Sequence, residues 1–421
     1  MAAIPRERTV DSSLALLKEG YTFIGSRCQR LGSDIFRTRL TGRPAICLFG
    51  AEASEMFFTP GRFTRKGALP PTTLRLLQDL GSVHQLDGEA HFQRKQMFLS
   101  VMRPAEAERL AAVFADHWQA RIPTWEAMPE VALFDEIEAL LCRAACSWAG
   151  IPVSERSARK RTAEFAAMLE GAGAIGSRLV RGLLLRNRCE RWARRVIERV
   201  RDGSREAPPE SAAYAIAWHR RPDGVLLDAG VAAVELINVL RPTVAIAYFV
   251  TFAAIALHEH PAWAERLRTG SPQELEWFVQ EVRRISPLFP LSAGRVLQPF
   301  EWRGHHVAGG TWMILDLYGT NRDPRSWDDP HVFRPERFRD WDGSPFNFIP
   351  QGGGDHATGH RCPGEWATIE ILKQAVQLLT ATMRYDVPEQ DLRVDLSRMP
   401  TLPNSRFVIR NVQHVAEPGQ E

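Results

Sequence analysis

A glycine-rich stretch with one cysteine, followed by an apolar helix pattern, constrains the fold of this chain more than any other feature. The stretch reads FNFIPQGGGDHATGHRCPGE over residues 346–365, and apolar residues at helical spacing follow over 366–380. The glycines allow the backbone near Cys362 to approach a bulky planar ligand. Arg361, His360 and the N-terminus of the next helix favour a cysteine thiolate. The pattern indicates a thiolate that binds a planar cofactor; the alternative is a buried free cysteine beside a glycine loop.

Two charged motifs precede this stretch. The first is EVRR at residues 281–284, and the second is FRPERF at residues 333–338. A charged pair at helical spacing is by itself usually part of a solvated helix face. All three motifs in this order resemble those of the cytochrome P-450 superfamily, whose iron is bound by a cysteine thiolate. The resemblance extends over essentially the whole chain.

This resemblance implies a fold and a cofactor. We expect the cytochrome P-450 fold, which is mainly α-helical with a small β-rich region. We also expect a haem b whose iron is bound by Cys362 as axial thiolate. The resemblance further implies that Glu281, Arg284 and Arg337 form one cluster of charges.

The cysteine stretch departs from the common form of the family in its length. Phe348 lies farther from Cys362 than the family's usual phenylalanine, and Arg361 directly precedes Cys362 instead of being separated from it by one residue. This longer form resembles that of one bacterial subgroup, the fatty-acid hydroxylases and decarboxylases that use hydrogen peroxide. The residues expected above the haem decide between this subgroup and ordinary monooxygenases.

Length and composition fit a soluble enzyme. The chain has 421 residues, of which 44% are apolar and 24% charged, and its net charge is +3. Such a small charge does not indicate nucleic-acid binding. We expect residues 1–421 to form a single haem-thiolate catalytic domain, with β-rich parts near 21–50 and 290–320 and without a flavin reductase domain.

The six cysteines are scattered in neither a disulfide nor a zinc pattern, which favours a reducing cytoplasm. Cys142 and Cys146 lie four residues apart but have no histidine nearby, so we expect them to pack in the core. The first eight residues, MAAIPRER, contain no apolar segment. We therefore expect neither a secretory signal nor a membrane anchor.

The longest apolar segment, residues 226–257, is expected to form a long central helix over the distal face of the haem. A transmembrane span is the alternative. The uninterrupted apolar part after Pro242 is shorter than the roughly 18 residues of a credible span, and Glu235, Asn238 and Arg241 interrupt the upstream half. The segment therefore favours a buried helix.

The pair Arg241-Pro242 lies in the middle of this predicted helix. An unpaired buried charge costs several kcal/mol, and an interior proline costs about 3 kcal/mol. The alternative to a function is an internal salt bridge plus an ordinary kink. Monooxygenase relatives usually carry an acid followed by threonine here, whereas the peroxide-using subgroup carries Arg-Pro. The resemblance implies that Arg241 binds a fatty-acid carboxylate, so Arg241 and Pro242 are candidate catalytic residues.

Basic residues in three segments are candidates for binding the haem propionates. A helix predicted to begin near Gly88 places His91 and Lys95 on one face, where both can point at one anionic group. By position, Arg295 on a predicted strand and Arg65 in a turn resemble the family's propionate-binding residues. The alternatives are a surface-charged helix for His91 and Lys95, and a solvated turn for Arg65.

His84 lies three residues before Asp87, in the loop ahead of that helix. In the resembling subgroup the matching position faces the carboxyl end of the substrate, and it is a histidine in alkene-forming members. Because histidine can donate or accept a proton near neutral pH, we expect His84 to influence which product forms. The alternative is a loop histidine with only a packing or solvent role.

Local patterns predict several further elements. The apolar turn SPLFPL contains residues that we expect to line a tunnel for the acyl chain, namely Leu288, Phe289 and Leu291. Asp11 is expected to cap a short helix that ends at Gly20, and helices are expected from Pro104 and over 178–201. Alternating apolar residues predict strands over 21–24, 35–40 and 44–49.

The resemblance to the peroxide-using subgroup implies hydrogen-peroxide-dependent oxidation of free fatty acids at Cα or Cβ. The expected products are 2- or 3-hydroxy fatty acids and, by oxidative decarboxylation, terminal alkenes. The expected partners are a free fatty acid and hydrogen peroxide, without a redox partner protein. Two other functions stay open: a monooxygenase that depends on redox partners, and a haem or fatty-acid binding sensor without turnover.

Overall fold

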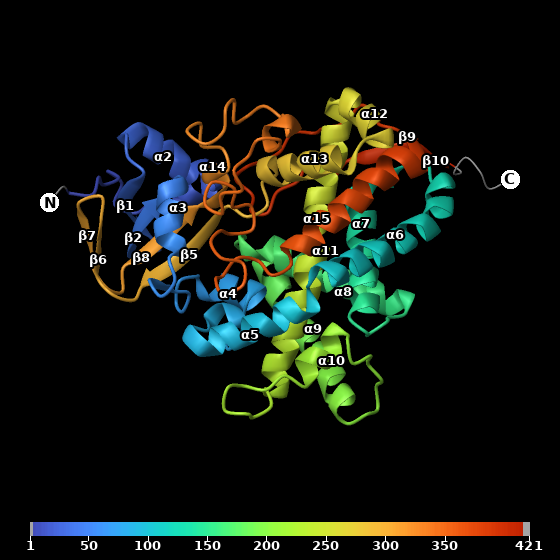
Figure 1. The fold of residues 1–421 in the computed structure, drawn as a ribbon, viewed down its shortest axis with the longest axis horizontal. Helices are drawn as coiled ribbons and strands as arrows, with labels where there is room; N and C mark the ends of the chain where they lie inside the picture. The colour runs from blue at the N-terminus through green and yellow to red at the C-terminus, as the bar shows by residue number, and fades with distance from the viewer. Residues whose placement is uncertain (1–2, 416–421) are drawn as a thin grey trace.

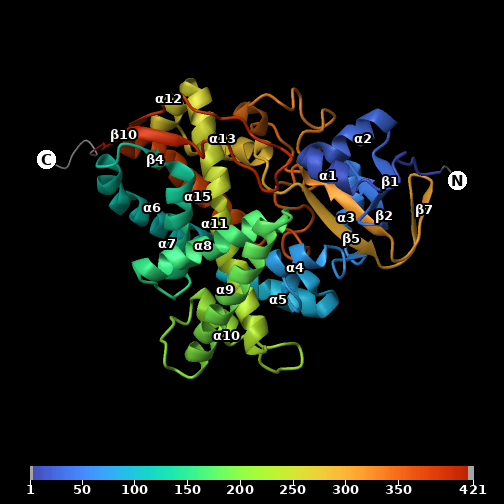
Figure 2. The same ribbon diagram turned by 180° about the vertical axis from the view of Figure 1, so that it is seen from behind.

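The computed structural model describes residues 3–415 and is mainly α-helical (Figure 1). Most helices gather toward one end of the long axis, and the largest sheet lies toward the other (Figures 1 and 2). The first α-helices are α1 (Ser13–Glu19), α2 (Phe23–Leu31), α3 (Ala51–Phe58), α4 (Pro71–Leu77), α5 (Gly88–Val101), α6 (Pro104–Glu126), α7 (Leu133–Trp148) and α8 (Glu155–Ala172). They are followed by α9 (Ser177–Arg201), α10 (Ala212–Ala217), α11 (Ala229–Glu259), α12 (Pro261–Thr269), α13 (Pro272–Ile285), α14 (Leu317–Thr320) and α15 (Glu365–Gln377). Short helical turns are η1 (Gly20–Thr22), η2 (Val83–Gln85), η3 (Pro335–Phe338) and the π-helical η4 (Leu378–Thr382).

The largest sheet joins strands from distant parts of the chain. Its order is β1-β2-β8-β5-β3; β2 and β8 are parallel, and the other neighbours are antiparallel. The strands are β1 (Ile35–Leu40), β2 (Arg43–Leu48), β3 (Phe63–Thr64), β5 (Leu291–Val296) and β8 (Trp312–Asp316). The remaining strands form β4 (Val131–Ala132)-β10 (Val408–His414)-β9 (Met383–Asp386) and the hairpin β6 (Phe300–Trp302)-β7 (His305–Val307). The strands predicted over 35–40 and 44–49 are thus confirmed, and β5 to β8 fall within 290–320.

The strand predicted over 21–24 is wrong, because this segment is helical. η1 and the start of α2 occupy it, and the residues buried in α2 are Phe23, Ile24, Arg27 and Cys28. This spacing is that of one helix face, which four residues alone could not reveal. Asp11 Oδ1 accepts the Ser13 N–H at 2.8 Å, but Ser12 occupies the N-cap position of α1. The predicted cap was therefore one residue too early.

Helix α11 forms the centre of the helical part, as predicted for 226–257. It packs against α7, α9 and α15. The helix is long and apolar enough to span a membrane by composition, but 89% of its most apolar window is buried inside the protein. Asp228 caps its first turn by accepting the Gly230 N–H at 2.7 Å, and Pro242 lies inside it without ending it. The main apolar core surrounds this helix and includes Cys142 and Cys146.

Candidate functional site

Cys362 lies just before α15, with its sulfur beside a side-chain amide. Its N–H donates to the Gln351 carbonyl oxygen at 3.1 Å, and Gln351 Nε2 lies 3.7 Å from Sγ. A Cβ added at Gly364 would lie 3.8 Å from Sγ and 3.3 Å from Met102 Sδ, so glycine keeps the space beside the sulfur open. Cys362 is half-buried, whereas the other five free cysteines are buried. This setting fits a sulfur that binds a large ligand.

The groups that set the pKa of this thiol agree only in part with those predicted: the N-terminus of α15 contributes through the Gly364 N–H, as expected, but Arg361 and His360 do not. Burial raises the pKa of Cys362, while the Gly364 N–H, Lys95 and Arg283 lower it. Arg361 is instead paired with Glu365, with Nε and Oε2 2.6 Å apart. Burial also holds the pKa of His360 well below its ordinary value, so its ring is neutral. The prediction that Arg361 and His360 favour the thiolate is therefore wrong.

The predicted Glu-Arg-Arg cluster is confirmed. Glu281 is fully buried at the end of α13 and receives Arg284 Nε on Oε2 at 2.7 Å and Arg337 Nε on Oε1 at 3.2 Å. Its Oε1 also accepts the backbone N–H of Arg334 at 2.9 Å. The cluster therefore fixes the 333–338 segment against α13.

A second buried arginine of the same motif was missed. Arg283 is 1% exposed, forms an ion pair with Glu365 and donates from Nη2 to Gln351 Oε1 at 3.0 Å. It thereby connects α13 to both sides of the Cys362 loop. The sequence signal was the doubled arginine in EVRR, since adjacent helix positions face different neighbours.

Arg241 is buried in α11 without a carboxylate partner. Its side chain is 4% exposed; Nη1 donates to the Leu76 carbonyl at 3.1 Å and Nη2 to the Leu77 carbonyl at 2.5 Å. Nε is buried without a hydrogen-bond partner, and no ion pair of Arg241 is found within residues 3–415. Burial and nearby Arg186 lower its pKa to about 9. The internal salt bridge considered as an alternative is thus not observed.

His84 lies in η2, where burial and the nearby charge of Arg241 lower its pKa. Its Nδ1 is buried without a hydrogen-bond partner. Burial, followed by Arg241 and Lys95, lowers the pKa of His84 to about 3. The imidazole is therefore neutral near pH 7, which contradicts the expectation that it exchanges protons there. A neutral ring can still donate or accept a hydrogen bond.

His91 and Lys95 both lie on the buried face of α5. The ring of His91 packs against that of His360 with centroids 4.1 Å apart and the ring planes tilted by 41°, and Lys95 Nζ donates to the Arg361 carbonyl. Their exposed fractions are 6% and 2%, so a surface-charged helix is not observed here. Burial lowers the pKa of Lys95 to about 8 and that of His91 to about 4. The structure thus brings α5 directly against the cysteine stretch.

Arg65 and Arg295 lie at the paired strands β3 and β5, at one edge of the largest sheet. Arg65 Nη1 donates to the Ala293 carbonyl at 2.6 Å, and its guanidinium lies 4.4 Å from the ring centre of Phe57. Arg295 on β5 donates from Nε to the Gly67 carbonyl at 2.9 Å. Besides burial, the charges of Arg241, Lys95 and Arg65 all lower the pKa of His84. A concentration of basic groups of this kind, together with Cys362, suits a haem thiolate whose propionates are anions.

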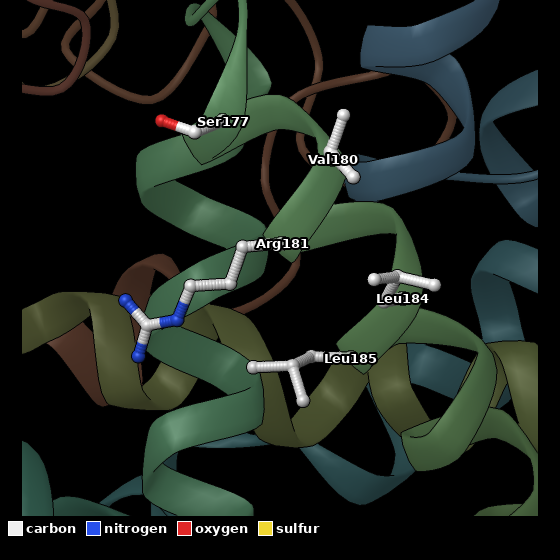
Figure 3. A pocket seen from close by; sticks show the side chains of 5 residues that line it. All are labelled: Ser177, Val180, Arg181, Leu184 and Leu185. Atoms are coloured by element: carbon white, nitrogen blue, oxygen red, sulfur yellow. The ribbon is translucent and has the colours of Figure 1, made fainter.

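The predicted tunnel residues differ in burial. Leu288 is 6% exposed and its carbonyl accepts the Tyr21 hydroxyl at 2.9 Å, whereas Phe289 is 41% exposed and Leu291 is half-buried. A separate groove of about 480 Å³ lies along the first turns of α9 (Figure 3). None of the predicted site residues lines it; the lining residues are Ser177, Val180, Arg181, Leu184 and Leu185.

Comparisons with known proteins give the family. A family model described as "Cytochrome P450" matches residues 274–393. The solved structure of cytochrome P450SP alpha (CYP152B1) in complex with (R)-ibuprophen is 48% identical over 96% of this chain and 99% of that one, with a TM-score of 0.93. Cytochrome P450EX alpha (CYP152N1), solved with myristic acid, is 40% identical over 99% of this chain and 100% of that one, with a TM-score of 0.95.

A curated plant relative matches over a shorter region. Cytochrome P450 71D94 from Mentha gracilis is 37% identical over 99 residues, which are 22% of this chain. The match spans only 19% of that relative's length. The two solved structures, by contrast, align over nearly their whole length. The chain therefore belongs to the cytochrome P450 superfamily and, within it, to the CYP152 group.

Proposed function

We propose that this protein uses hydrogen peroxide to oxidise free fatty acids at Cα or Cβ. The products are 2- and 3-hydroxy fatty acids and, by loss of carbon dioxide, terminal alkenes. The observation that carries this proposal is Arg241, a buried cation in α11 that contacts carbonyl oxygens but no carboxylate. Support also comes from the similar P450EX alpha, which was solved with myristic acid.

Haem, when bound, supplies the redox chemistry of the reaction. Cys362 would hold its iron as thiolate, because metal ligation requires the deprotonated sulfur. His91, Lys95, Arg295 and Arg65 hold the propionates. Lys95, Arg295 and Arg65 each donate to a backbone carbonyl, and the ring of His91 packs against that of His360.

Arg241 anchors the substrate carboxylate. The carbonyls of Leu76 and Leu77 lie at the C-terminal end of α4, which carries a partial negative charge. They occupy the guanidinium donors that a carboxylate would take, and a carboxylate is the stronger acceptor. Once anchored, the carboxylate acts as general acid and base and moves a proton between the two oxygens of hydrogen peroxide. The carboxylate thereby takes the role of the acid and threonine that monooxygenase relatives carry at the positions of Arg241 and Pro242.

The test is peroxide-driven turnover of a series of fatty acids, with products identified by mass spectrometry. Wild type should give hydroxy acids and alkenes. Arg241→Ala should retain haem and lose roughly 100-fold or more in turnover, because binding and proton transfer are lost together. The exposed Arg195→Ala on α9 is the matched control. Unimpaired oxidation by Arg241→Ala would contradict the mechanism.

Two outcomes would favour other functions. Faster turnover with NADPH, reductase and ferredoxin than with peroxide would indicate a monooxygenase that depends on redox partners. Binding of haem and fatty acid without any product would indicate a sensor. A cytoplasmic location remains part of the proposal and is supported by the free state of the six cysteines.

A further inference from the structure

One buried carboxylate joins α5, η2 and α11, the three elements that carry Lys95, His84 and Arg241. Glu235 is 0% exposed and lies on α11, upstream of Arg241. Its Oε1 accepts Arg94 Nη1 on α5 at 2.6 Å and the Val83 N–H in η2 at 2.8 Å. Its Oε2 accepts Asn238 Nδ2 at 3.1 Å. A single side chain therefore fixes α5 and η2 to α11.

Each attachment lies next to a residue of the proposed mechanism. Val83 directly precedes His84 in η2, and Arg94 lies on α5 between His91 and Lys95. The N–H of Val83 has its acceptor in this carboxylate, and Arg94 has no other ion pair within residues 3–415. Arg94 Nε is buried without a hydrogen-bond partner, so the guanidinium depends on Glu235 for its charge balance.

The same face of α11 also fixes the end of α4. Asn238 Nδ2 donates to the Gln78 carbonyl at 3.2 Å, one residue after the Leu77 carbonyl that Arg241 contacts. Glu235, Asn238 and Arg241 follow at intervals of three residues and thus share one side of the helix. Segment 76–83 is consequently attached to α11 at both of its ends.

Stability alone does not explain this arrangement. A buried ion pair contributes little net stability compared with a well-packed apolar pair of similar volume. An apolar pair, however, could not accept the Val83 N–H. What the carboxylate adds is a defined position for η2 and α5 relative to Arg241.

We propose that Glu235 is a positioning residue, which acts through Val83 and Arg94 to set where His84 and the α5 residues lie relative to Arg241. Its hydrogen-bond partners are Val83, Arg94 and Asn238. The inference rests on the proposed function only for what His84 and Arg241 do; the attachment itself is independent of turnover.

The test uses the full-length haem-loaded protein and two variants. E235L/R94M replaces the ion pair by an apolar pair, which keeps the charge balanced but removes the acceptor of the Val83 N–H. E235Q keeps an acceptor and leaves Arg94 without its counter-charge; it is used if the double variant does not fold. The matched control is E164L/R161M, a buried pair on α8 with Nη2 and Oε1 2.9 Å apart.

Three measurements separate positioning from stability: amide hydrogen exchange of the peptide containing Val83, the Kd of myristate from the change in haem absorption, and thermal unfolding. E235L/R94M should unfold within a few degrees of wild type, yet exchange at Val83 and the Kd should each rise about tenfold or more. The control should change neither. If E235L/R94M folds with unchanged Val83 exchange and unchanged Kd, Glu235 has only a structural role.

Failure of the proposed function would look different. A wild-type protein that does not oxidise fatty acids with peroxide would refute the peroxygenase proposal, but the exchange of Val83 would still decide the role of Glu235.

Discussion

Cys362 is surrounded by groups with opposing effects on its thiol. Burial raises its pKa, whereas Lys95, Arg283 and the Gly364 N–H lower it. As a ligand of haem iron, Cys362 would be deprotonated. We predict that Cys362→Ala loses the red-shifted Soret band of the reduced carbon monoxide complex. Absorption spectra test this, with the remote Cys28→Ala as control; a Cys362→Ala protein that keeps the band would refute the assignment.

His84 is expected to act through a hydrogen bond and not through its charge. Since its pKa is about 3, its ring stays neutral between pH 6 and 8. We predict that wild type forms terminal alkene beside hydroxy acids, with a share that does not change over this pH range, and that His84→Gln lowers this share. Gas chromatography of the products is the measurement. A wild type that forms only hydroxy acids, or an unchanged ratio in His84→Gln, would exclude this role.

Sequence reasoning found residues that stand in motifs, including the paired charges of Glu281, Arg284 and Arg337, but missed ion pairs that no motif marks. Cys362, Arg241 and Lys95 stand in motifs or on a predicted helix; Arg241 and Lys95 are buried and Cys362 is half-buried, while their roles stay predictions. The partners of Arg94 could not be predicted, because Glu235 is distant in sequence and nothing local links the two. The ion pair of Arg361 with Glu365, only four residues away, is of the kind that helical spacing indicates.

At the level of elements, Glu281 connects α13 to η3. It receives two arginine side chains and one backbone N–H while fully buried. Removing its charge leaves two largely buried guanidinium groups unbalanced, so we predict that Glu281→Gln lowers the free energy of unfolding by roughly 3–5 kcal/mol. Urea unfolding measures the loss. Glu265→Gln on α12, whose ion pair with Arg268 is exposed, should change stability by less than about 1 kcal/mol; equal effects would argue against the cluster.

Element boundaries were predictable where a residue has one conformational role. Pro104 begins α6 and Gly88 begins α5, as proline at a first helical position and the loop before 88 indicated. The helical character of 21–24 was not predictable in the same way. Four residues span barely one turn, and the two periods differ clearly only over longer windows.

At the level of the whole molecule, buried titratable side chains make the free energy of unfolding depend on pH. Burial raises the pKa of Glu138 on α7 to about 8 from 4.5. The folded state therefore binds a proton that the unfolded state has released, so this contribution is present below pH 4.5 and is lost as pH rises through about 8. Burial lowers the pKa of His219 to about 4, which acts in the opposite sense: stability falls as pH drops below 6.5.

Glu138→Gln separates these two effects. A neutral amide has no proton to lose, so the variant should gain stability relative to wild type as pH rises from 5 to 8, by roughly 2–4 kcal/mol at the upper end. Thermal unfolding at pH 5, 6.5 and 8 measures this. The exposed Glu108→Gln on α6 is the control. A difference between variant and wild type that is the same at all three pH values would contradict the prediction.

The order of strands in the largest sheet has a consequence for how the chain is made. β2 pairs with β8, and β3 pairs with β5, although β5 and β8 are synthesised long after β2 and β3. As the chain leaves the ribosome, one edge of β2 stays unpaired until β8, which ends at Asp316, has emerged. The partner of β4, β10, emerges later still. Unpaired strand edges invite association with other chains. We therefore expect the edge of β2 to be a place where the nascent chain can associate with other chains until β8 has formed.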